Sequence, residues 1–212
     1  MKKIIITIDG PAASGKGRIA EYISKRWNLK HLDSGILYRI IAYNILKKDI
    51  NIDSIKDIHN FIISDTKLSY RKFKKLRSEQ ISKIASKIAV FKFVRNHVNN
   101  FQREFVKKNL KNNGFVIDGR DIGSVVFKNA DLKLYIDVNS EIRAKRRYKQ
   151  LIDSGEKSIY PKILKEIKLR DKKDKNRKNS PLVRPKGAYI IDNNGSFSNT
   201  KNQIKNIIKK IL

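Results

Sequence analysis

Residues 4–17 read IIITIDGPAASGKG, and this stretch decides the fold. Its first part, residues 4–8, is a β-branched run typical of a buried strand, and it leads directly into a loop of the pattern G-x-x-x-x-G-K. Glycines let consecutive backbone N–H groups wrap a phosphate at the start of a helix, while Lys16 reaches the β and γ oxygens. Gly17 stands where the common motif has Ser or Thr. The stretch predicts a phosphate-binding loop, which alone does not choose among kinases, ATPases and GTPases.

Short apolar runs alternate with helical patterns along the rest of the chain. The runs expected to form strands are residues 3–8, 30–32, 114–117, 132–138 and 188–191. Helical patterns fill residues 15–26, 36–47, 80–108, 141–151, 161–168 and 200–212. Near-continuous apolar runs of this length suit strands that are buried on both faces of a parallel sheet. The alternation therefore predicts an α/β fold, a P-loop NTPase-type five-stranded parallel sheet flanked by helices.

The chain length and two irregular segments bound the domain organisation. A chain of 212 residues suits one well-buried core, and nothing in it resembles a linker or an internal repeat. Residues 49–77 fit the alternation least well and are expected to form an insert. Residues 154–186 form a second irregular, highly charged region. We therefore expect a single domain over residues 1–212 that carries these two additions.

The formal net charge of +29 first suggests a nucleic-acid partner, because basic surfaces bind phosphate backbones. The lysines are spread over the whole chain, however, so we expect most of the excess on a solvated surface and expect no nucleic-acid partner. No stretch approaches the roughly 20 apolar residues of a membrane span, and the N-terminus has no leader pattern. The expected location is the cytoplasm, without a membrane partner. Zero cysteines exclude disulfides and thiolate metal sites.

Three clusters of charged residues suggest a second phosphate-bearing substrate. Residues 31–39 place Arg39 about one helical turn beyond the end of a strand, where it can hold a phosphate bidentately. Residues 115–123 are an apolar strand that ends in an Asp of Walker-B type, followed by an Arg and an Asp on a glycine-flanked loop. Residues 170–177 are a charged segment suited to closing over phosphates as a lid. No acidic general base is required, since phosphoryl transfer depends chiefly on positioning and charge neutralisation.

Taken together, these pieces resemble the bacterial cytidylate kinases. The matching pieces, in family order, are residues 9–17, 32–35 with Tyr38 and Arg39, Ala85 and Ser86 with Arg95, 118–123, Arg143 with Arg146 and Arg147, 170–177, and Pro181 with Leu182. They cover almost the whole chain. The resemblance implies ATP-dependent phosphorylation of CMP and dCMP with Mg²⁺, by a kinase domain with a nucleoside-monophosphate-binding insert at about residues 40–100 and a lid at about 150–186. It also implies small nucleotides as the partners of a monomeric enzyme.

The resemblance implies a role for each matching residue. The implied ATP-binding residues are Gly10, Pro11, Ala12, Ala13, Ser14, Gly15, Lys16, Gly17, Arg18, Arg143, Arg146 and Arg147. The implied CMP-binding residues are Asp33, Ser34, Arg39, Ser86, Arg95, Arg120, Asp121, Arg170, Asp174 and Arg177. Among these, the catalytic residues would be Lys16 on the transferring phosphate and Arg39, Arg120 and Arg177 on the CMP phosphate. Ser86, Arg95 and Asp121 would read the cytosine, and Arg170 with Asp174 the sugar. No residue is assigned as a direct metal ligand.

Two departures and two alternatives stay open. Arg18 stands where the family usually has Thr, which bears on Mg²⁺ handling, and residues 40–86 are shorter than the insert of many relatives, which bears on base discrimination. One alternative is a P-loop kinase for another small acceptor such as UMP. The other is an RNA-associated basic binding module, against which the phosphate loop and the lack of aromatic stacking motifs argue.

Overall fold

The computed structural model describes residues 3–65, 68–70, 76, 78–109, 112–153 and 155–210, and the chain divides into two compact units. Unit 1 comprises residues 1–31 and 112–212, and unit 2 comprises residues 32–111. The expected insert at 49–77 falls partly on residues 66–67, 71–75 and 77, which lie outside the described residues.

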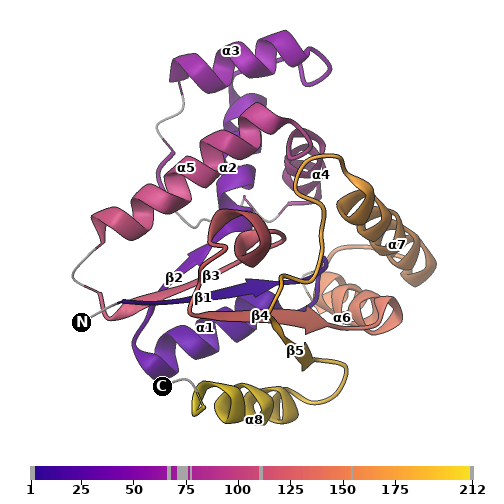
Figure 1. The fold of residues 1–212 in the computed structure, drawn as a ribbon. Helices are drawn as coiled ribbons and strands as arrows, with labels where there is room; N and C mark the ends of the chain where they lie inside the picture. The colour runs from indigo at the N-terminus through magenta and orange to yellow at the C-terminus, as the bar shows by residue number, and fades with distance from the viewer. Residues whose placement is uncertain are drawn as a thin grey trace. The chain divides into compact units, whose positions relative to one another are not determined.

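A five-stranded sheet runs through the fold in the order β2-β3-β1-β4-β5, which confirms the expected α/β sheet (Figure 1). Its strands are β1 (Ile4–Asp9), β2 (Lys30–Asp33), β3 (Gly114–Gly119), β4 (Leu132–Asp137) and β5 (Tyr189–Asp192). The central strand β1 pairs in parallel with β3 and with β4, and β4 pairs in parallel with β5. In this register Asp9 lies opposite Gly119 on one side and Tyr135 on the other. Parallel pairing thus gathers the carboxyl ends of these strands at one edge of the sheet.

The core of unit 1 consists of the sheet and the helices that cover it. Its helices are α1 (Lys16–Trp27), α6 (Ser140–Asp153), α7 (Tyr160–Asn176) and α8 (Phe197–Ile208). The isoleucines of β1 pack with apolar residues of α1 and α8 in one cluster, in which Ile6, Ile19 and Ile204 are fully buried. Helices α6 and α7 pack together through a smaller cluster that contains Ala144 and Ile167. The apolar β-branched strands therefore have the buried environment that their composition predicts.

Unit 2 is helical and has its own core. Its helices are α2 (Ser34–Lys47), α3 (Ile55–Asp65), α4 (Glu79–Ile88) and α5 (Lys92–Lys108). Leu37 and Ile41 of α2, Ile58 of α3, Ile88 of α4 and Val98 of α5 belong to one buried cluster. This cluster explains why residues 49–77, which lack the strand and helix alternation, still hold a helix: α3 contributes an apolar face to a helical core.

The structure departs from the sequence-based elements at two boundaries and in one additional helix. The single helix expected at 80–108 is two helices, because the chain turns at residues 89–91 between α4 and α5 without a Gly or Pro to mark the break. Helix α7 continues to Asn176, so Arg170 and Asp174 lie on a regular helix rather than in an irregular region. A π-helix, η2 (Ile122–Val126), follows β3 and was not expected from the sequence.

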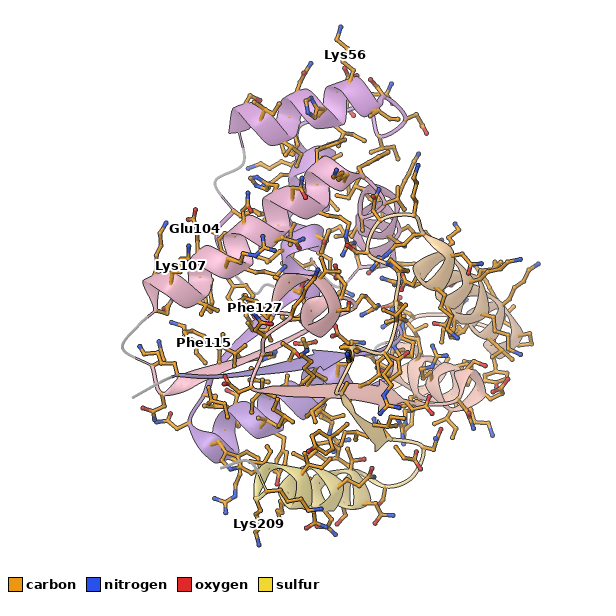
Figure 2. All side chains as sticks on the ribbon, viewed as in Figure 1. Lys56, Glu104, Lys107, Phe115, Phe127 and Lys209 are labelled. Carbon is orange, nitrogen blue, oxygen red and sulfur yellow. The ribbon has the colours of Figure 1, made fainter. Side chains whose placement is uncertain are left out.

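Charged side chains cover the surface of both units. Figure 2 shows Lys56 of α3 and Lys209, next to the end of α8, pointing away from the backbone, and both are exposed. None of the helices in the described part of the chain combines the length and the apolar character that a membrane crossing needs.

Candidate functional site

The predicted phosphate loop lies where the sequence places it, between the end of β1 at Asp9 and the start of α1 at Lys16. Two of its glycines are sterically required. Gly10 has a φ of 154°, and a Cβ built there lies 2.8 Å from the carbonyl oxygen of Ile136. Gly15 has a φ of 85°, and its Cβ would lie 2.7 Å from the side chain of Asn193. The loop thus packs against the adjoining segments as tightly as a phosphate-wrapping loop requires.

Lys16, the central residue of the predicted donor site, is held across the loop. Its ammonium group donates to the carbonyl oxygen of Pro11 at 2.6 Å and to the hydroxyl of Ser14 at 3.2 Å. Burial lowers the pKa of Lys16 well below its usual value, and Arg120 lowers it further against the opposing effect of Asp118 and two other carboxylates. A phosphate bound in the loop would supply the negative charge that a buried ammonium needs.

Two residues that sequence reasoning did not single out support the phosphate loop: Asn193, directly after β5, and Thr200 on α8. Asn193 is 5% exposed, and its side chain donates to the backbone carbonyl of Ser14 at 2.8 Å. Its own side-chain oxygen accepts from the fully buried hydroxyl of Thr200 at 2.8 Å. The available signal was positional: Asn193 directly follows a strand, at the sheet edge where parallel α/β proteins bind ligands.

The three α6 arginines expected on the ATP side differ in position. Arg143 is 3% exposed and binds the carbonyl oxygens of Val138 and Ala12, each at 3.0 Å, and the carboxylate of Asp171. Arg146 donates to the carbonyl of Gly195, and Arg147 to the side chain of Gln150, each at 3.1 Å. Among these three arginines, as the structure describes them, Arg143 is the one that bonds to the phosphate loop, through Ala12.

Arg18, the departure from the family pattern, stacks on an aromatic ring. Its guanidinium carbon lies 3.9 Å from the ring centre of Phe197, the first residue of α8. This is a cation–π contact, and it occupies the guanidinium face with the protein's own ring. Residues Ala13 and Gly17 of the loop are respectively exposed and half-buried, and a Cβ built at Gly17 meets nothing within 4 Å.

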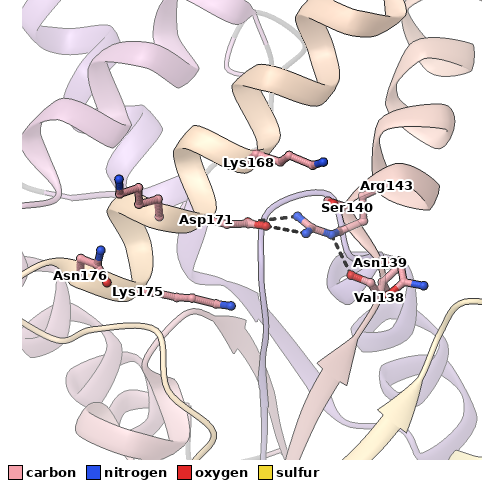
Figure 3. A pocket seen from close by; sticks show the side chains of 9 residues that line it. Val138, Asn139, Ser140, Arg143, Lys168, Asp171, Lys175 and Asn176 are labelled. Carbon is pink, nitrogen blue, oxygen red and sulfur yellow. Dashed lines mark hydrogen bonds and ion pairs between the residues drawn. The ribbon is translucent and has the colours of Figure 1, made fainter.

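A cavity of about 470 Å³ lies beside Arg143 (Figure 3). It is lined by Val138, Asn139, Ser140, Arg143, Lys168, Asp171, Lys172, Lys175 and Asn176. Figure 3 shows Arg143 between Asp171 and the carbonyl of Val138, with Lys168 and Lys175 on the facing helix α7. The volume is within the range of small-molecule sites, and the lysines make the lining cationic. The cavity is therefore suited to an anionic ligand close to the phosphate loop.

Asp174 on α7 draws two of the predicted phosphate-binding arginines together. Arg120 donates to one oxygen of this carboxylate at 3.1 Å, and Arg177 lies 3.6 Å from the other. Burial alone would raise the pKa of Asp174, but the charges of Arg120, Arg170 and Arg177 outweigh it and hold the pKa below its usual value. The guanidinium of Arg177 also donates to the carbonyl of Ser180. Three arginines from separate points of unit 1 thus converge on one buried anion.

The loop after β3 is held by hydrogen bonds within the loop and from neighbouring strands. Asp121 is 3% exposed, and its backbone carbonyl accepts from Val125 at 2.9 Å and from Val126 at 3.2 Å, the second of which is an i→i+5 bond of the kind that defines the π-helix η2. The carboxylate of Asp118, the strand-end Asp of Walker-B type, is 2.7 Å from the imidazole of His31. Asp9 reaches the same loop from β1 and accepts from the backbone of Ile122 and of Gly123. The conformation of this loop therefore depends on side chains from neighbouring strands.

The remaining predicted residues belong to unit 2. Asp33 caps α2 by accepting from the backbone of Ile36 at 3.3 Å, and the next residue, Ser34, is buried. Arg95 is 3% exposed, donates to the carbonyl of Ala89 at 3.0 Å, and lies over the ring of Tyr38. Arg39 on α2 and Ser86 on α4 are half-buried. Arg95 thus satisfies a carbonyl at the end of α4, which is where the helix predicted from sequence is interrupted.

The predicted residues accordingly form two sets, one in each unit. Unit 1 brings the phosphate loop together with Arg143, and Arg120 with Asp174 and Arg177, while Arg146 and Arg147 bind elsewhere on the protein. Unit 2 holds Asp33, Ser34, Arg39, Ser86 and Arg95. The arrangement within unit 1 places a lysine, several guanidinium groups and a glycine-rich backbone where they can bind polyphosphate.

Comparison with known proteins gives a consistent family. The model of the family described as cytidylate kinase matches residues 6–212. A cytidylate kinase of Rickettsia felis is 41% identical over 208 residues, which cover 98% of this chain and 92% of that protein. A cytidylate kinase of Bartonella henselae is 40% identical over 194 residues, covering 91% of this chain and 87% of that protein. A solved Thermus thermophilus protein shares the fold, with a TM-score of 0.55, 14% identity and full coverage of both chains.

Proposed function

The chain belongs to the cytidylate kinase family, and we propose that it transfers the γ-phosphoryl group of ATP to CMP and dCMP. The observation that supports this most directly is the pairing of two phosphate sites within unit 1. One is the loop around Lys16, and the other is the arginine cluster around Asp174. A kinase that joins two nucleotides needs both a donor and an acceptor phosphate site.

On the donor side, the loop from Gly10 to Arg18 binds the ATP phosphates, and Lys16 neutralises charge on the transferring group. Arg143 holds the carbonyl of Ala12 and so fixes the loop, and the neighbouring cationic cavity adds positive charge beside the bound phosphates. Arg146 and Arg147 contribute positive charge on the same helix. In this assignment the loop conformation is held by the protein's own contacts, which limits the reorganisation needed during transfer.

Mg²⁺ is expected to enter with the nucleotide. Because Gly17 has no hydroxyl and open space around it, the residues present fit an ion that is coordinated chiefly by phosphate oxygens and water. The ion would neutralise the charge that develops between the β and γ phosphates.

On the acceptor side, the similarity to the cytidylate kinases assigns the CMP phosphate to Arg120, Arg177 and Arg39. The guanidiniums of Arg120 and Arg177 are ordered by Asp174, so they pay little conformational entropy when a phosphate binds. Arg170 with Asp174 binds the sugar, while Asp33 and Ser34 position the start of α2. Units 1 and 2 therefore correspond to the kinase core with its lid, and to the nucleoside-monophosphate-binding insert.

The base is read through hydrogen-bonding edges that are reversed between cytosine and uracil. Cytosine offers an exocyclic amino donor beside an N3 acceptor, whereas uracil offers an O4 acceptor beside an N3–H donor. An ionised Asp121 only accepts and Arg95 only donates, so this pair, supported by Ser86, matches cytosine and mismatches uracil. Buried polar groups left without partners are costly, which gives a preference for CMP over UMP of roughly a hundredfold or more.

The proposal extends to the setting of the enzyme. We expect a monomer in the cytoplasm, since both phosphate sites are supplied by one chain and small nucleotides are its only required partners. A basic surface that is spread over both units suits solubility more than a defined nucleic-acid footprint.

A coupled assay of ADP formation tests the proposal. The purified chain is offered ATP and Mg²⁺ with CMP, dCMP, UMP, AMP or no acceptor, and Lys16→Ala is run in parallel. We expect turnover with CMP and dCMP, weak turnover with the other acceptors, and slow hydrolysis without acceptor. A preference for UMP or AMP would overturn the acceptor assignment. Salt-dependent RNA binding without any nucleotide turnover would favour the RNA-associated alternative instead.

A further inference from the structure

Asp9, the last residue of β1, makes a bridge that the assigned site does not include. Its side chain is completely buried, and its two carboxylate oxygens each accept one backbone N–H at 2.7 Å. The donors are Ile122 and Gly123, which lie 113 and 114 positions further along the chain. Short hydrogen bonds to an ionised carboxylate are among the stronger ones in proteins.

These two N–H groups begin η2, directly after the loop that carries Arg120 and Asp121. The loop is tightly fitted at this point, because a Cβ built at Gly123 lies 2.7 Å from the hydroxyl of Thr7 and 3.1 Å from Asp9. Only glycine lets the backbone approach β1 closely enough for both bonds. A π-helix is rare and is often found at functional sites, which agrees with a loop whose shape is fixed for a purpose.

Two charged side chains and one phenol interact electrostatically with the carboxylate. They are Asp121 of the loop, Lys16 of α1, and Tyr135 of the neighbouring strand β4. Asp9 also immediately precedes the phosphate loop, yet its two carboxylate oxygens bond to the loop after β3. Its position therefore couples the end of the central strand to the loop proposed to contact CMP.

We propose that Asp9 is a positioning residue for the acceptor: its ionised carboxylate sets the conformation of the loop that presents Arg120 and Asp121 to CMP. This inference rests on the proposed function of that loop. Asp9 does not touch either substrate and takes no part in the chemical step. Its removal should therefore impair use of CMP more than use of ATP.

The state of charge of Asp9 makes the bridge sensitive to mild acid. Burial raises the pKa of its carboxyl to about 6, even though the two N–H donors and Lys16 lower it. Above this pH the group is ionised and accepts both bonds. As pH falls through about 6 one oxygen gains a proton, and that oxygen accepts a backbone N–H less well. The loop is thus released on the acid side.

The kinetic test compares wild type, Asp9→Asn and a matched control. The amide keeps the size of the carboxyl but replaces one acceptor by a donor, which cannot pair with a backbone N–H. The control is Asp131→Asn, because Asp131 also accepts a backbone N–H from β1, that of Ile5 at 2.9 Å, but at the opposite end of the strand. For Asp9→Asn we expect at least about a tenfold loss of kcat/KM for CMP, with KM for ATP within about twofold of wild type. The control should resemble wild type in both.

The pH profile separates positioning from a purely structural role. CMP itself titrates near pH 6, so the useful quantity is the wild-type to Asp9→Asn ratio of kcat/KM, in which the substrate's titration cancels. This ratio should be largest near about pH 8 and shrink up to about tenfold by about pH 5, where roughly a tenth of Asp9 remains ionised. A ratio that is independent of pH, or an equal loss for ATP and CMP, would overturn the proposal.

A measurement on wild-type protein without substrate tests the Asp9 bridge even if the variant does not fold or the proposed function is wrong. In wild-type protein, the amide proton resonances of Ile122 and Gly123 should shift together with an apparent pKa near 6, while that of Ile5 should not. Amides that do not titrate would refute the bridge itself. Gly123→Ala provides a second variant, because the added methyl displaces the loop while Asp9 is retained, and it should show the same selective loss for CMP. If the bridge titrates but CMP is not a substrate at all, the proposed function fails rather than the bridge.

Discussion

Replacing Asn193 by Ala should loosen the phosphate loop although Asn193 is not itself among the residues expected to contact ATP. The Asn193 side chain joins three segments: it donates to Ser14 of the loop and accepts from Thr200 of α8, each at 2.8 Å, at the end of β5. It also fills the space beside Gly15, where a Cβ would lie 2.7 Å from it. The substitution removes all of these contacts at once.

The loss of stability follows from the polar groups that lose their hydrogen-bond partner. The carbonyl of Ser14 loses a buried donor, which costs about 1–3 kcal/mol when the group stays without water. The hydroxyl of Thr200 keeps a longer bond, 3.3 Å, to the carbonyl of Ser196, so it adds little. A total near 2 kcal/mol corresponds to a fall in Tm of roughly 4–8 °C for a chain of this size. Because the loop is no longer held in its binding conformation, KM for ATP should also rise several-fold.

Thr200→Val is the matched comparison. It removes the hydroxyl but keeps the bond from Asn193 to Ser14, so it should lower Tm while leaving KM for ATP near the wild-type value. Thermal unfolding and steady-state kinetics at saturating CMP measure the two effects. If Asn193→Ala changes neither Tm nor KM for ATP, or if Thr200→Val raises KM to the same extent, the loop is not held through this bond.

Further predictions concern the assigned residues. Lys16→Ala should reduce kcat by roughly 10²–10³ with the fold intact by circular dichroism, and near-wild-type turnover would contradict its role. Arg177→Ala should cost roughly 2 kcal/mol of transition-state stabilisation, seen as a fall in kcat/KM for CMP, and an unchanged value would remove Arg177 from the acceptor site. Asp121→Asn should lower CMP activity and narrow the ratio of CMP to UMP, since an amide both donates and accepts, whereas a constant ratio would make Asp121 structural. Because the folded-state pKa of Asp174 lies below 3.8, its ionised form stabilises the fold above that pH, and this contribution is lost as pH falls further. Urea unfolding of Asp174→Asn should therefore show a weaker dependence on pH between about pH 5 and about pH 3 than wild type does.

The features that sequence predicted correctly are those encoded locally. Each apolar strand, each helix and the glycine pattern before Lys16 is encoded by residues that are close together in the sequence. The alternation of strand and helix follows from these local patterns. The break between α4 and α5 was missed because apolar residues continue in helical spacing on both sides of it. At the break, Arg95 of α5 donates to the carbonyl of Ala89, six positions earlier in the chain, a contact that the apolar spacing does not indicate.

The site residues missed by sequence reasoning act over long separations. Asn193 binds a residue 179 positions away, and Asp9 binds backbone groups more than 100 positions away. The sequence pattern assigns no role to Asn193, and it includes Asp9 only as the first residue of the matched stretch 9–17. Their importance comes from burial and from the pairing of strands, which brings the ends of β1, β3 and β4 side by side. Such second-layer contacts become visible only when the topology is known.

The arginine cluster shows why positioning residues matter in this site. A guanidinium that must be ordered on binding loses side-chain entropy, whereas Arg120 and Arg177 are already tied to Asp174. Asp174 suits this role, since its lowered pKa favours the ionised carboxylate at neutral pH. In the proposed acceptor site, Asp174 orders Arg120 and Arg177 from α7, and Asp9 positions the loop that carries Arg120 from β1. We therefore propose that acceptor recognition depends on two anions that lie behind the cations.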